Sequence, residues 1–136
     1  MVFGKENRMN IEEILSNAIQ ADASDIFLIP GLPLTYKCNG TQNRVGDKML
    51  YSEDIEALVK EIYVISKRET TNLDNRVDDD FSFAISGLGR FRVNAFRQRG
   101  SLAAVIRVIR FGIPDPEKMN IPESVLNLAE YKKGLV

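Results

Sequence analysis

The chain has 136 residues, which is enough for one ordinary domain and leaves no room for a second full one. Its formal net charge of -1 argues against binding nucleic acid or acidic membranes over the whole surface, so any anion site must be local. The single cysteine, Cys38, excludes an internal disulfide, and the absence of histidine excludes the usual zinc sites. The N-terminus lacks the apolar core of a signal peptide, and no segment approaches the roughly 18 apolar residues of a membrane span. We therefore expect a soluble, non-exported chain in a reducing compartment, with no metal.

The first half of the chain is expected to form helices around a pair of strands. Asn10 begins a helix with a capping box, because Glu13 stands three residues later and apolar residues then recur at helical spacing. Residues 25–29 are typical of a buried strand, residues 34–38 of a half-buried strand that ends at an Asn-Gly turn, and a short strand is plausible near residues 44–45. Ser52 is expected to cap a second helix, and a capping box over residues 66–69 predicts a short third helix. The apolar stripe of the second helix is Ile55, Leu58, Val59, Ile62 and Tyr63.

Residues 81–85, 90–98 and 101–109 predict three strands of a meander, which makes the fold class α+β, an antiparallel sheet with helices packed on it. Residues 87–89 are expected to form an odd, three-residue loop with Gly89 in the left-handed region. This loop would place Phe81, Phe83 and Ile85 opposite Ala95, Val93 and Phe91 on the core face. From Gly112 a Pro-rich linker follows, and Pro122 suits the first position of a helix that runs to about Tyr131.

Two arginines fall opposite each other if Arg99-Gly100 is a two-residue turn. Gln98 then pairs with Ser101, and the same register places Arg92 opposite Arg107 on one face, away from an apolar core face. Like charges directly opposite on a sheet repel, so this pair indicates either an anion between the two guanidiniums or separate carboxylate partners. Phosphate is the natural anion for the planar donor fork of arginine. The plainer interpretation pairs each arginine with one of Asp78, Asp79 and Asp80 or leaves it solvated.

A family resemblance is carried by five segments of the chain. They are Ala23-Ser24-Asp25-Ile26, Gly31-Leu32-Pro33, Asp80-Phe81-Ser82-Phe83, Gly89-Arg90-Phe91-Arg92-Val93-Asn94-Ala95-Phe96 and Lys133-Gly134-Leu135-Val136. In this order they resemble the retraction (twitching motility) ATPases of type IV pili, within the pilus-assembly and type II secretion ATPase family. The match covers nearly the whole chain from Asn10, and the run from Gly89 is its most specific part.

This resemblance implies a PAS-like N-terminal domain of a hexameric motor, with residues 1–9 a disordered or tag-like N-terminus, residues 10–111 the domain, and residues 112–136 a linker and the start of a RecA-like ATPase core. In such motors two arginines of this domain reach the nucleotide phosphates, and these positions fall on Arg92 and Arg107. The partners implied are the ATPase core of the same or a neighbouring subunit, the other subunits of a homo-hexamer and the inner-membrane pilus machinery. ATP and Mg²⁺ are implied for the parent protein, which would work in the cytoplasm at the inner face of the cell membrane. The phosphate-binding loop of the family would follow beyond Val136, so this chain alone is expected to need no cofactor, to bind nucleotide weakly and not to hydrolyse ATP.

Other readings stay open beside this one. The chain could be a free-standing PAS-like ligand-sensing domain, which requires an apolar cavity, or a protein-interaction domain that never touches nucleotide. Arg90, Arg97, Arg99 and Arg110 add positive charge to the hairpin, but an aromatic stacking platform is missing, so no nucleic acid is expected as a partner. The run from Asp78 to Asp80 is interpreted as a solvated strand entry, and Cys38 as a small packing residue.

Overall fold

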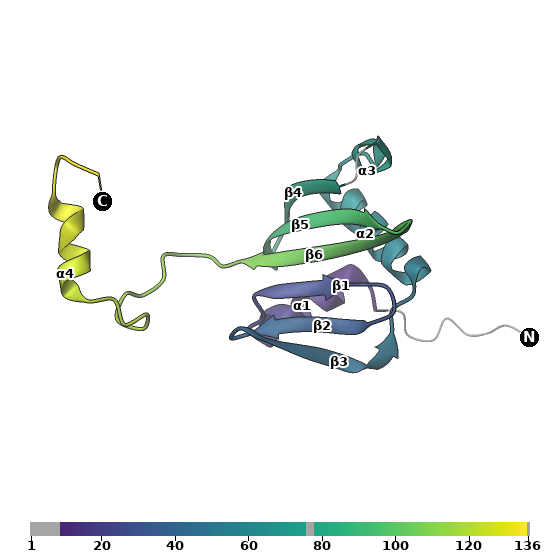
Figure 1. Cartoon of the computed structure of the whole chain (residues 1–136), viewed down its shortest axis with the longest axis horizontal. Helices are drawn as coiled ribbons and strands as arrows, with labels where there is room; N and C mark the ends of the chain where they lie inside the picture. The colour runs from purple at the N-terminus through teal and green to yellow at the C-terminus, as the bar shows by residue number, and fades with distance from the viewer. Residues whose placement is uncertain (1–8, 76–77, 136) are drawn as a thin grey trace, which may run out of the picture.

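The computed structural model describes residues 9–75 and 78–135, and it contains a six-stranded antiparallel sheet with two helices packed on one face (Figure 1). This arrangement confirms the predicted α+β class. The elements in chain order are α1 (Ile11–Gln20), β1 (Asp25–Leu28), β2 (Pro33–Cys38), β3 (Thr41–Met49), α2 (Ser52–Ser66), α3 (Thr71–Asn75), β4 (Asp78–Ile85), β5 (Gly89–Gln98), β6 (Ser101–Ile109), α4 (Glu123–Leu126) and the 3-10 helix η1 (Asn127–Glu130).

The sheet joins two groups of neighbouring strands in the order β3-β2-β1-β6-β5-β4. The first group runs through the β1–β2 and β2–β3 hairpins, and the second is the predicted meander of β4, β5 and β6. Strand β1 pairs with β6, so that Asp25 lies opposite Arg107 and Ile26 opposite Ile106. This long-range pairing joins the two groups of strands into one sheet and brings residues from the two ends of the domain onto one surface.

The core lies between the sheet and the helices α1 and α2. Asn10 caps α1 as predicted, since its side chain accepts a hydrogen bond of 2.9 Å from the Glu13 N–H. The predicted stripe of α2 is buried in full, and the strands contribute apolar side chains from the face that meets the helices. The most completely buried large side chains are Phe91, Ile11, Ile14, Leu15, Ile26, Leu28, Ile55, Ile62, Ile106, Val59 and Val93. Apolar burial on this scale is the main favourable term in folding.

Helix ends in the first half differ in detail from the sequence prediction. The N-cap of α2 is Tyr51, whose N–H donates to Asp54 Oδ2 at 2.9 Å, and Ser52 instead is the first helical residue. The capping box expected over residues 66–69 is wrong, because α2 continues to Ser66 and ends at Lys67 in the left-handed conformation. Helix α3 begins only at Thr71. The third strand, expected near residues 44–45, is present as the longer β3.

The loop between β4 and β5 has the expected odd length but sits one residue earlier than predicted. Ile85 pairs with Gly89, so the three loop residues are 86–88, and Phe81 and Phe83 lie opposite Val93 and Phe91. Gly87, with φ of +77°, occupies the left-handed region, and the Leu88 N–H bonds to the Ile85 carbonyl at 3.0 Å. The third position of such a turn requires a positive φ, which glycine adopts easily. Gly87 occupies this position, whereas Gly89 is already the first residue of β5. The aromatic side chains still face the core.

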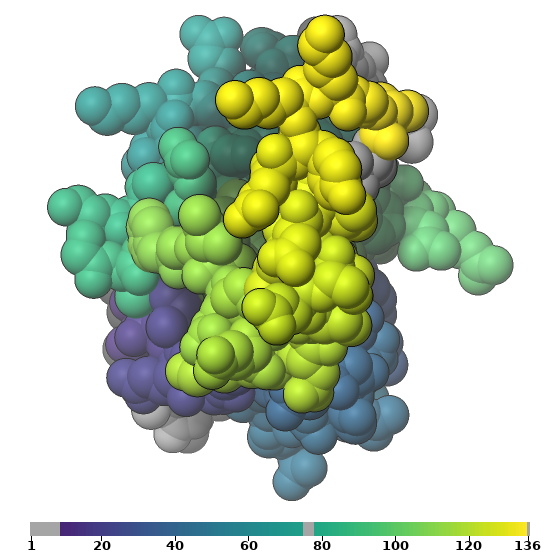
Figure 2. Space-filling model, turned by 90° about the vertical axis from the view of Figure 1, so that its left-hand side faces the viewer, coloured from purple at the N-terminus to yellow at the C-terminus, as the bar shows by residue number. Residues whose placement is uncertain are grey.

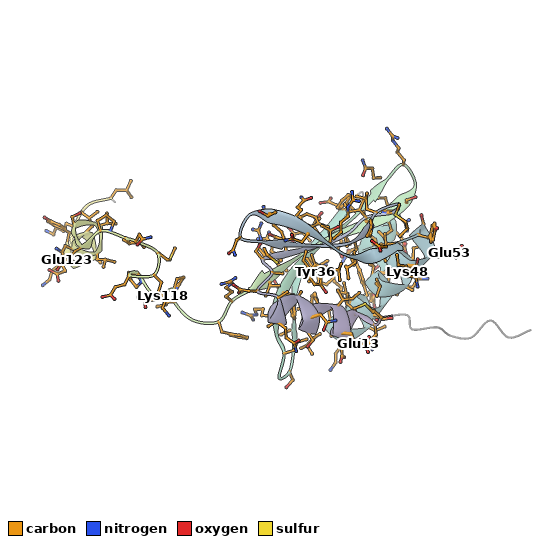
Figure 3. The ribbon with its side chains drawn as sticks, turned by 90° about the horizontal axis from the view of Figure 1, so that it is seen from below. Glu13, Tyr36, Lys48, Glu53, Lys118 and Glu123 are labelled. Carbon is orange, nitrogen blue, oxygen red and sulfur yellow. The ribbon has the colours of Figure 1, made fainter. Side chains whose placement is uncertain are left out.

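Beyond β6 the chain leaves the sheet (Figure 1). The end-on view in Figure 2 shows this C-terminal segment in front of the sheet and its helices, and Lys118 and Glu123 lie away from them in Figure 3. Pro122 is the N-cap of α4, and the predicted helix is divided into α4 and η1. The division at residues 111 and 112 remains a prediction.

Residues 1–8 of the expected N-terminal tail lie outside the described part of the chain. Met9, which was assigned to that tail, packs against the core instead, so the packed region begins at least one residue earlier than expected. Within residues 9–75 and 78–135, no helix combines the length and the apolar character needed to cross a bilayer.

Candidate functional site

The two predicted arginines lie opposite each other on the sheet face that α1 and α2 leave uncovered. Gln98 pairs with Ser101 across the Arg99-Gly100 turn, and Arg92 pairs with Arg107, which confirms the predicted register. The neighbouring strands extend this rung to Asp25 on one side and Ser82 on the other. An open hollow of about 300 Å³ on this face is lined by Asp25, Asp80, Arg92, Asn94, Val105 and Arg107.

Arg92 is held by a two-pronged ion pair with Asp80. Its Nε donates to Asp80 Oδ1 at 3.0 Å and its Nη2 donates to Oδ2 at 2.9 Å. These hydrogen bonds lower the pKa of the Asp80 carboxyl below its ordinary value, so Asp80 is ionised at neutral pH. Both side chains are largely in water, with 61% of Arg92 and 41% of Asp80 exposed. Exposed pairs of this kind contribute little to stability, because water and salt screen them.

Arg107 is held differently, by a buried carboxylate on the neighbouring strand. Its Nε donates to Asp25 Oδ1 at 3.1 Å, and the Asp25 side chain is only 11% exposed whereas that of Arg107 is 70% exposed. The Ser24 hydroxyl donates to the other oxygen, Asp25 Oδ2, at 2.9 Å. The Asp25 carboxylate is therefore held by two donors, the Ser24 hydroxyl and Arg107 Nε, and it in turn holds the Arg107 guanidinium through Nε.

The two like charges on one rung thus have separate carboxylate partners, one of the two outcomes that the sequence left open. The plainer interpretation, a pair with one of Asp78 to Asp80, is met by Arg92 through Asp80. Sequence reasoning missed Asp25 as the partner of Arg107, because the pairing of β1 with β6 joins residues that are 82 positions apart. The contact of both arginines with phosphate remains a prediction.

The aspartate run at the start of β4 is exposed at Asp78 and Asp80, as expected, but not at Asp79. Asp79 is buried, and its side chain accepts hydrogen bonds from Arg68 Nε at 2.8 Å, Arg68 Nη2 at 2.6 Å and the Tyr63 hydroxyl at 2.7 Å. Strand alternation carried the signal, since Asp79 falls on the same face as Phe81 and Phe83. Among the described residues, His, Cys, Asp and Glu side chains form no group of three that could hold a metal ion.

The remaining arginines of the hairpin are spread around its edges. Arg97 lies 3.9 Å from Asp74, and Arg110 Nη2 lies 2.7 Å from Asp22 Oδ1. Arg99 occupies the tip of the β5–β6 turn with positive φ. Among the residues that line the hollow, the arginines are Arg92 and Arg107, so the other arginines of the hairpin do not extend it into a continuous basic stripe.

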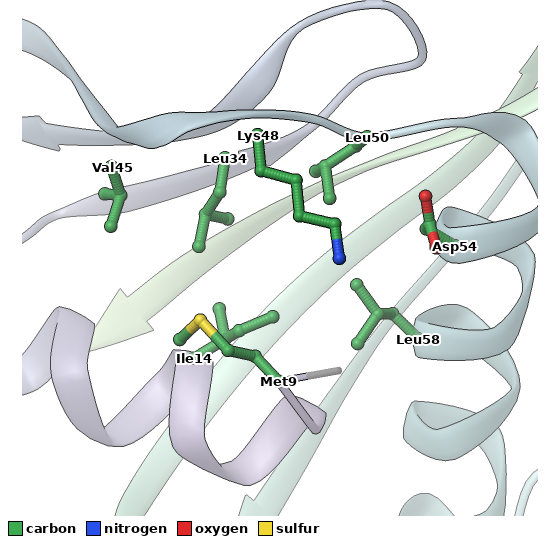
Figure 4. Close-up of a pocket in the computed structure, with 8 residues that line it drawn as sticks. All are labelled: Met9, Ile14, Leu34, Val45, Lys48, Leu50, Asp54 and Leu58. Atoms are coloured by element: carbon green, nitrogen blue, oxygen red, sulfur yellow. The ribbon is translucent and has the colours of Figure 1, made fainter. Parts of the chain in front are cut away.

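A second, apolar pocket lies between α1, α2 and the β2–β3 hairpin (Figure 4). Its volume is about 110 Å³, and it is lined by Met9, Ile14, Leu34, Val45, Lys48, Leu50, Asp54 and Leu58. Lys48 and Asp54 are its charged members, and the rest are apolar. Pockets that bury a drug-sized ligand have volumes of roughly 300–1,000 Å³, so this one has room for a much smaller group. Cys38 lies outside this pocket and packs half-buried against the core, as expected.

No protein-family model matches the chain. Among curated proteins it is 32% identical over 128 residues to the type IV pilus ATPase PilU of Pseudomonas aeruginosa and 30% identical over 128 residues to the type IV pilus retraction ATPase PilT of the same organism. Each alignment covers 94% of this chain, and 33% and 37% of the respective relatives. The chain therefore spans about a third of the length of the relatives it matches.

Solved structures give the same picture. A crystal structure described as the pilus retraction motor PilT with bound ADP superposes with a TM-score of 0.71 at 34% sequence identity, and covers 90% of this chain and 36% of that one. The ATPase DotB of Legionella pneumophila has a TM-score of 0.62 at 23% identity, which indicates a shared fold. This chain thus matches the N-terminal domain of the PilT structure.

Proposed function

Because the chain is homologous to the N-terminal domain of type IV pilus ATPases such as PilT and PilU, we propose that it supplies Arg92 and Arg107 to the phosphates of a nucleotide bound by an ATPase core. The observation that carries this proposal is the pair of arginines on one rung of an open sheet face. The pair offers two planar donor forks to one ligand, which suits the oxygens of a phosphate group.

The proposed role is electrostatic. In phosphoryl transfer, charge spreads over the oxygens of the transferred group, and an arginine that reaches them stabilises the transition state by a factor on the order of 10³–10⁵ in the best-studied cases. When phosphate leaves, the two arginines lose their shared ligand, and the domain is free to move as a rigid body relative to the core. The six-stranded sheet suits such a movement, because it holds both arginines on one stiff surface.

The wider setting belongs to the same proposal. The partner would be a RecA-like core of the same or a neighbouring subunit within a homo-hexamer, and ATP with Mg²⁺ would be the nucleotide of the whole protein. We place this PAS-like domain on the cytoplasmic side of the pilus machinery of the inner membrane. The homology to PilT and PilU supports this setting.

Alanine substitutions in the full-length ATPase test the proposal. Arg92→Ala and Arg107→Ala should each lower turnover by at least about tenfold, because a lost arginine–phosphate contact in a dry site costs more than the roughly 1.4 kcal/mol of a tenfold change. The hexamer should still form, as measured by light scattering after size-exclusion chromatography. Arg99→Ala is the matched control, since it removes the same charge from the tip of the same hairpin. Unchanged turnover in both test variants would contradict the proposal, and loss of the hexamer would favour an interaction domain.

A ligand-sensing domain is the alternative, and the apolar pocket is the observation that favours it. A sensor would respond to a small apolar compound in that pocket. Leu58→Trp, which fills the pocket, should abolish such a response and leave the arginine-dependent turnover intact. Turnover that follows the pocket variant instead of the arginine variants would favour the alternative.

A further inference from the structure

On the premise of the proposed function, we propose that two carboxylates of the hollow have opposite roles toward the arginines. Asp25 is a positioning residue, which holds Arg107 ready for a phosphate ligand. Asp80 is a competitor, which occupies the edge of Arg92 that a phosphate must take. The hollow therefore contains one prepared arginine and one that is released by exchange of a carboxylate for a phosphate.

The geometry of Arg107 supports the positioning role of Asp25. Only Nε of Arg107 is engaged, and its two terminal amino groups make no hydrogen bond to any residue within the described ranges 9–75 and 78–135. These terminal groups are the donors that a phosphate would meet end-on. The anchor itself is rigid, because Asp25 is buried on a central strand and its second oxygen accepts a hydrogen bond from Ser24. Ordering of the side chain before binding lowers the entropy lost when the ligand arrives.

The geometry of Arg92 supports the competing role of Asp80. Nε and Nη2, which together form the side edge of the guanidinium, donate to the two carboxylate oxygens in parallel. A phosphate would use the same edge in the same two-pronged way. Because both partners are exposed, the pair is weak in water, and a ligand with more negative charge can replace the carboxylate. Asp80 also repels any anion that enters the hollow.

The positioning role of Asp25 and the competing role of Asp80 predict opposite changes in phosphate affinity. Removing the competitor in Asp80→Asn should tighten phosphate binding. Removing the anchor in Asp25→Asn should weaken it, although a simple gain of positive charge would predict tighter binding in both variants. Ser24→Ala separates position from charge, because it leaves the net charge unchanged and removes the hydroxyl that lies 2.9 Å from Asp25 Oδ2 and 3.2 Å from the Lys37 carbonyl oxygen. It should weaken binding in the same direction as Asp25→Asn.

The binding experiment uses the 136-residue chain and inorganic pyrophosphate as the probe. Nitrogen-15 NMR follows the Nε–H signals of Arg92 and Arg107 during the titration, and far-ultraviolet circular dichroism checks that each variant is folded. Relative to the wild-type chain, Asp80→Asn should bind pyrophosphate about threefold more tightly or better, and Ser24→Ala about threefold more weakly, as suits contacts at a partly exposed site. Asp78→Asn is the matched control, because it removes one charge from the same face of β4 without removing an arginine partner.

The outcomes are distinct. Asp80→Asn binding no tighter than Asp78→Asn would overturn the competing role. Binding that is unchanged or tighter in both Ser24→Ala and Asp25→Asn would overturn the positioning role, and if Asp25→Asn does not fold, Ser24→Ala alone decides. In the full-length ATPase, Asp25→Asn should lower kcat, whereas Asp80→Asn should lower KM. If Arg92→Ala and Arg107→Ala leave both pyrophosphate binding and turnover unchanged, the proposed function itself fails, and this result is separate from the behaviour of the carboxylates.

Discussion

The buried ion pair between Arg68 and Asp79 offers a direct test of how the domain is held together. Arg68 follows the end of α2 and joins it to Asp79 on β4 through two hydrogen bonds. Its guanidinium also lies 4.6 Å from the centre of the Phe81 ring. Asp79 is 5% exposed and Arg68 33% exposed, so the carboxylate depends on protein donors far more than the arginine depends on its acceptor. We predict that Arg68→Ala destabilises the fold strongly.

The expected loss in the free energy of unfolding of Arg68→Ala lies between two reference cases. Breaking a buried ion pair by removing one partner costs about 3–5 kcal/mol, whereas exposed pairs contribute about 0–1 kcal/mol. Because the Tyr63 hydroxyl still donates to Asp79 and Arg68 is one-third exposed, we expect an intermediate loss of about 2–3 kcal/mol, which includes the contact with the Phe81 ring.

Urea unfolding followed by circular dichroism measures this loss. With a slope of about 1–3 kcal/mol per molar urea for small proteins, the midpoint should fall by about 0.7–3 M. Arg97→Ala is the matched control, since Arg97 lies 3.9 Å from Asp74 in an exposed pair, and its midpoint should change by less than about 0.5 M. A loss below about 1 kcal/mol in Arg68→Ala would refute the reasoning, because it would assign the buried pair the energy of a surface pair.

Two further predictions concern single residues. Burial raises the pKa of Tyr36 to about 12, so the stability that this neutral hydroxyl contributes is complete below pH 10 and is lost as the pH rises through about 12. Burial also raises the pKa of Tyr63, so alkaline titration at 295 nm should show two late phenols in the wild-type chain and one fewer in Tyr36→Phe. Gly87→Ala should cost about 1–2 kcal/mol in urea unfolding because φ is +77°, whereas Gly89→Ala, whose added carbon would meet its nearest neighbour at 3.5 Å, should cost less than about 0.5 kcal/mol; equal costs would contradict the assigned turn.

Local patterns in the sequence were enough to predict most elements and the register of the arginines. The two-residue turn at Arg99-Gly100 sets the pairing of β5 with β6, because a turn of fixed length leaves no freedom in the residues that flank it. The position of Arg92 opposite Arg107 follows from this turn alone. The stripe of α2 followed equally from its spacing, since one helical face must be buried.

Predictions failed where two local signals competed. Both Gly87 and Gly89 could supply a positive φ to the loop. The choice between them shifts the pairing of β4 with β5 by two residues, and each side chain of β4 stays on the predicted face of the sheet. At residues 66–69 the capping-box pattern competed with continued helix, and the packing of α2 against the sheet extended the helix through Ser66. Pairing rules of this kind state which face a residue takes more reliably than which neighbour it meets.

The charged partners of the site depend on pairing that no local pattern specifies. Asp25 meets Arg107 only because β1, from the first hairpin, pairs with β6, from the end of the meander. The contact between Asp25 and Arg107 therefore forms only when β1 pairs with β6 and the two groups of strands become one sheet. An arginine held by its own hairpin would keep its position in a partly folded chain, whereas one held across the β1–β6 junction is placed only in the complete fold. The side-chain position of Arg107 thus depends on the joining of the two halves of the sheet.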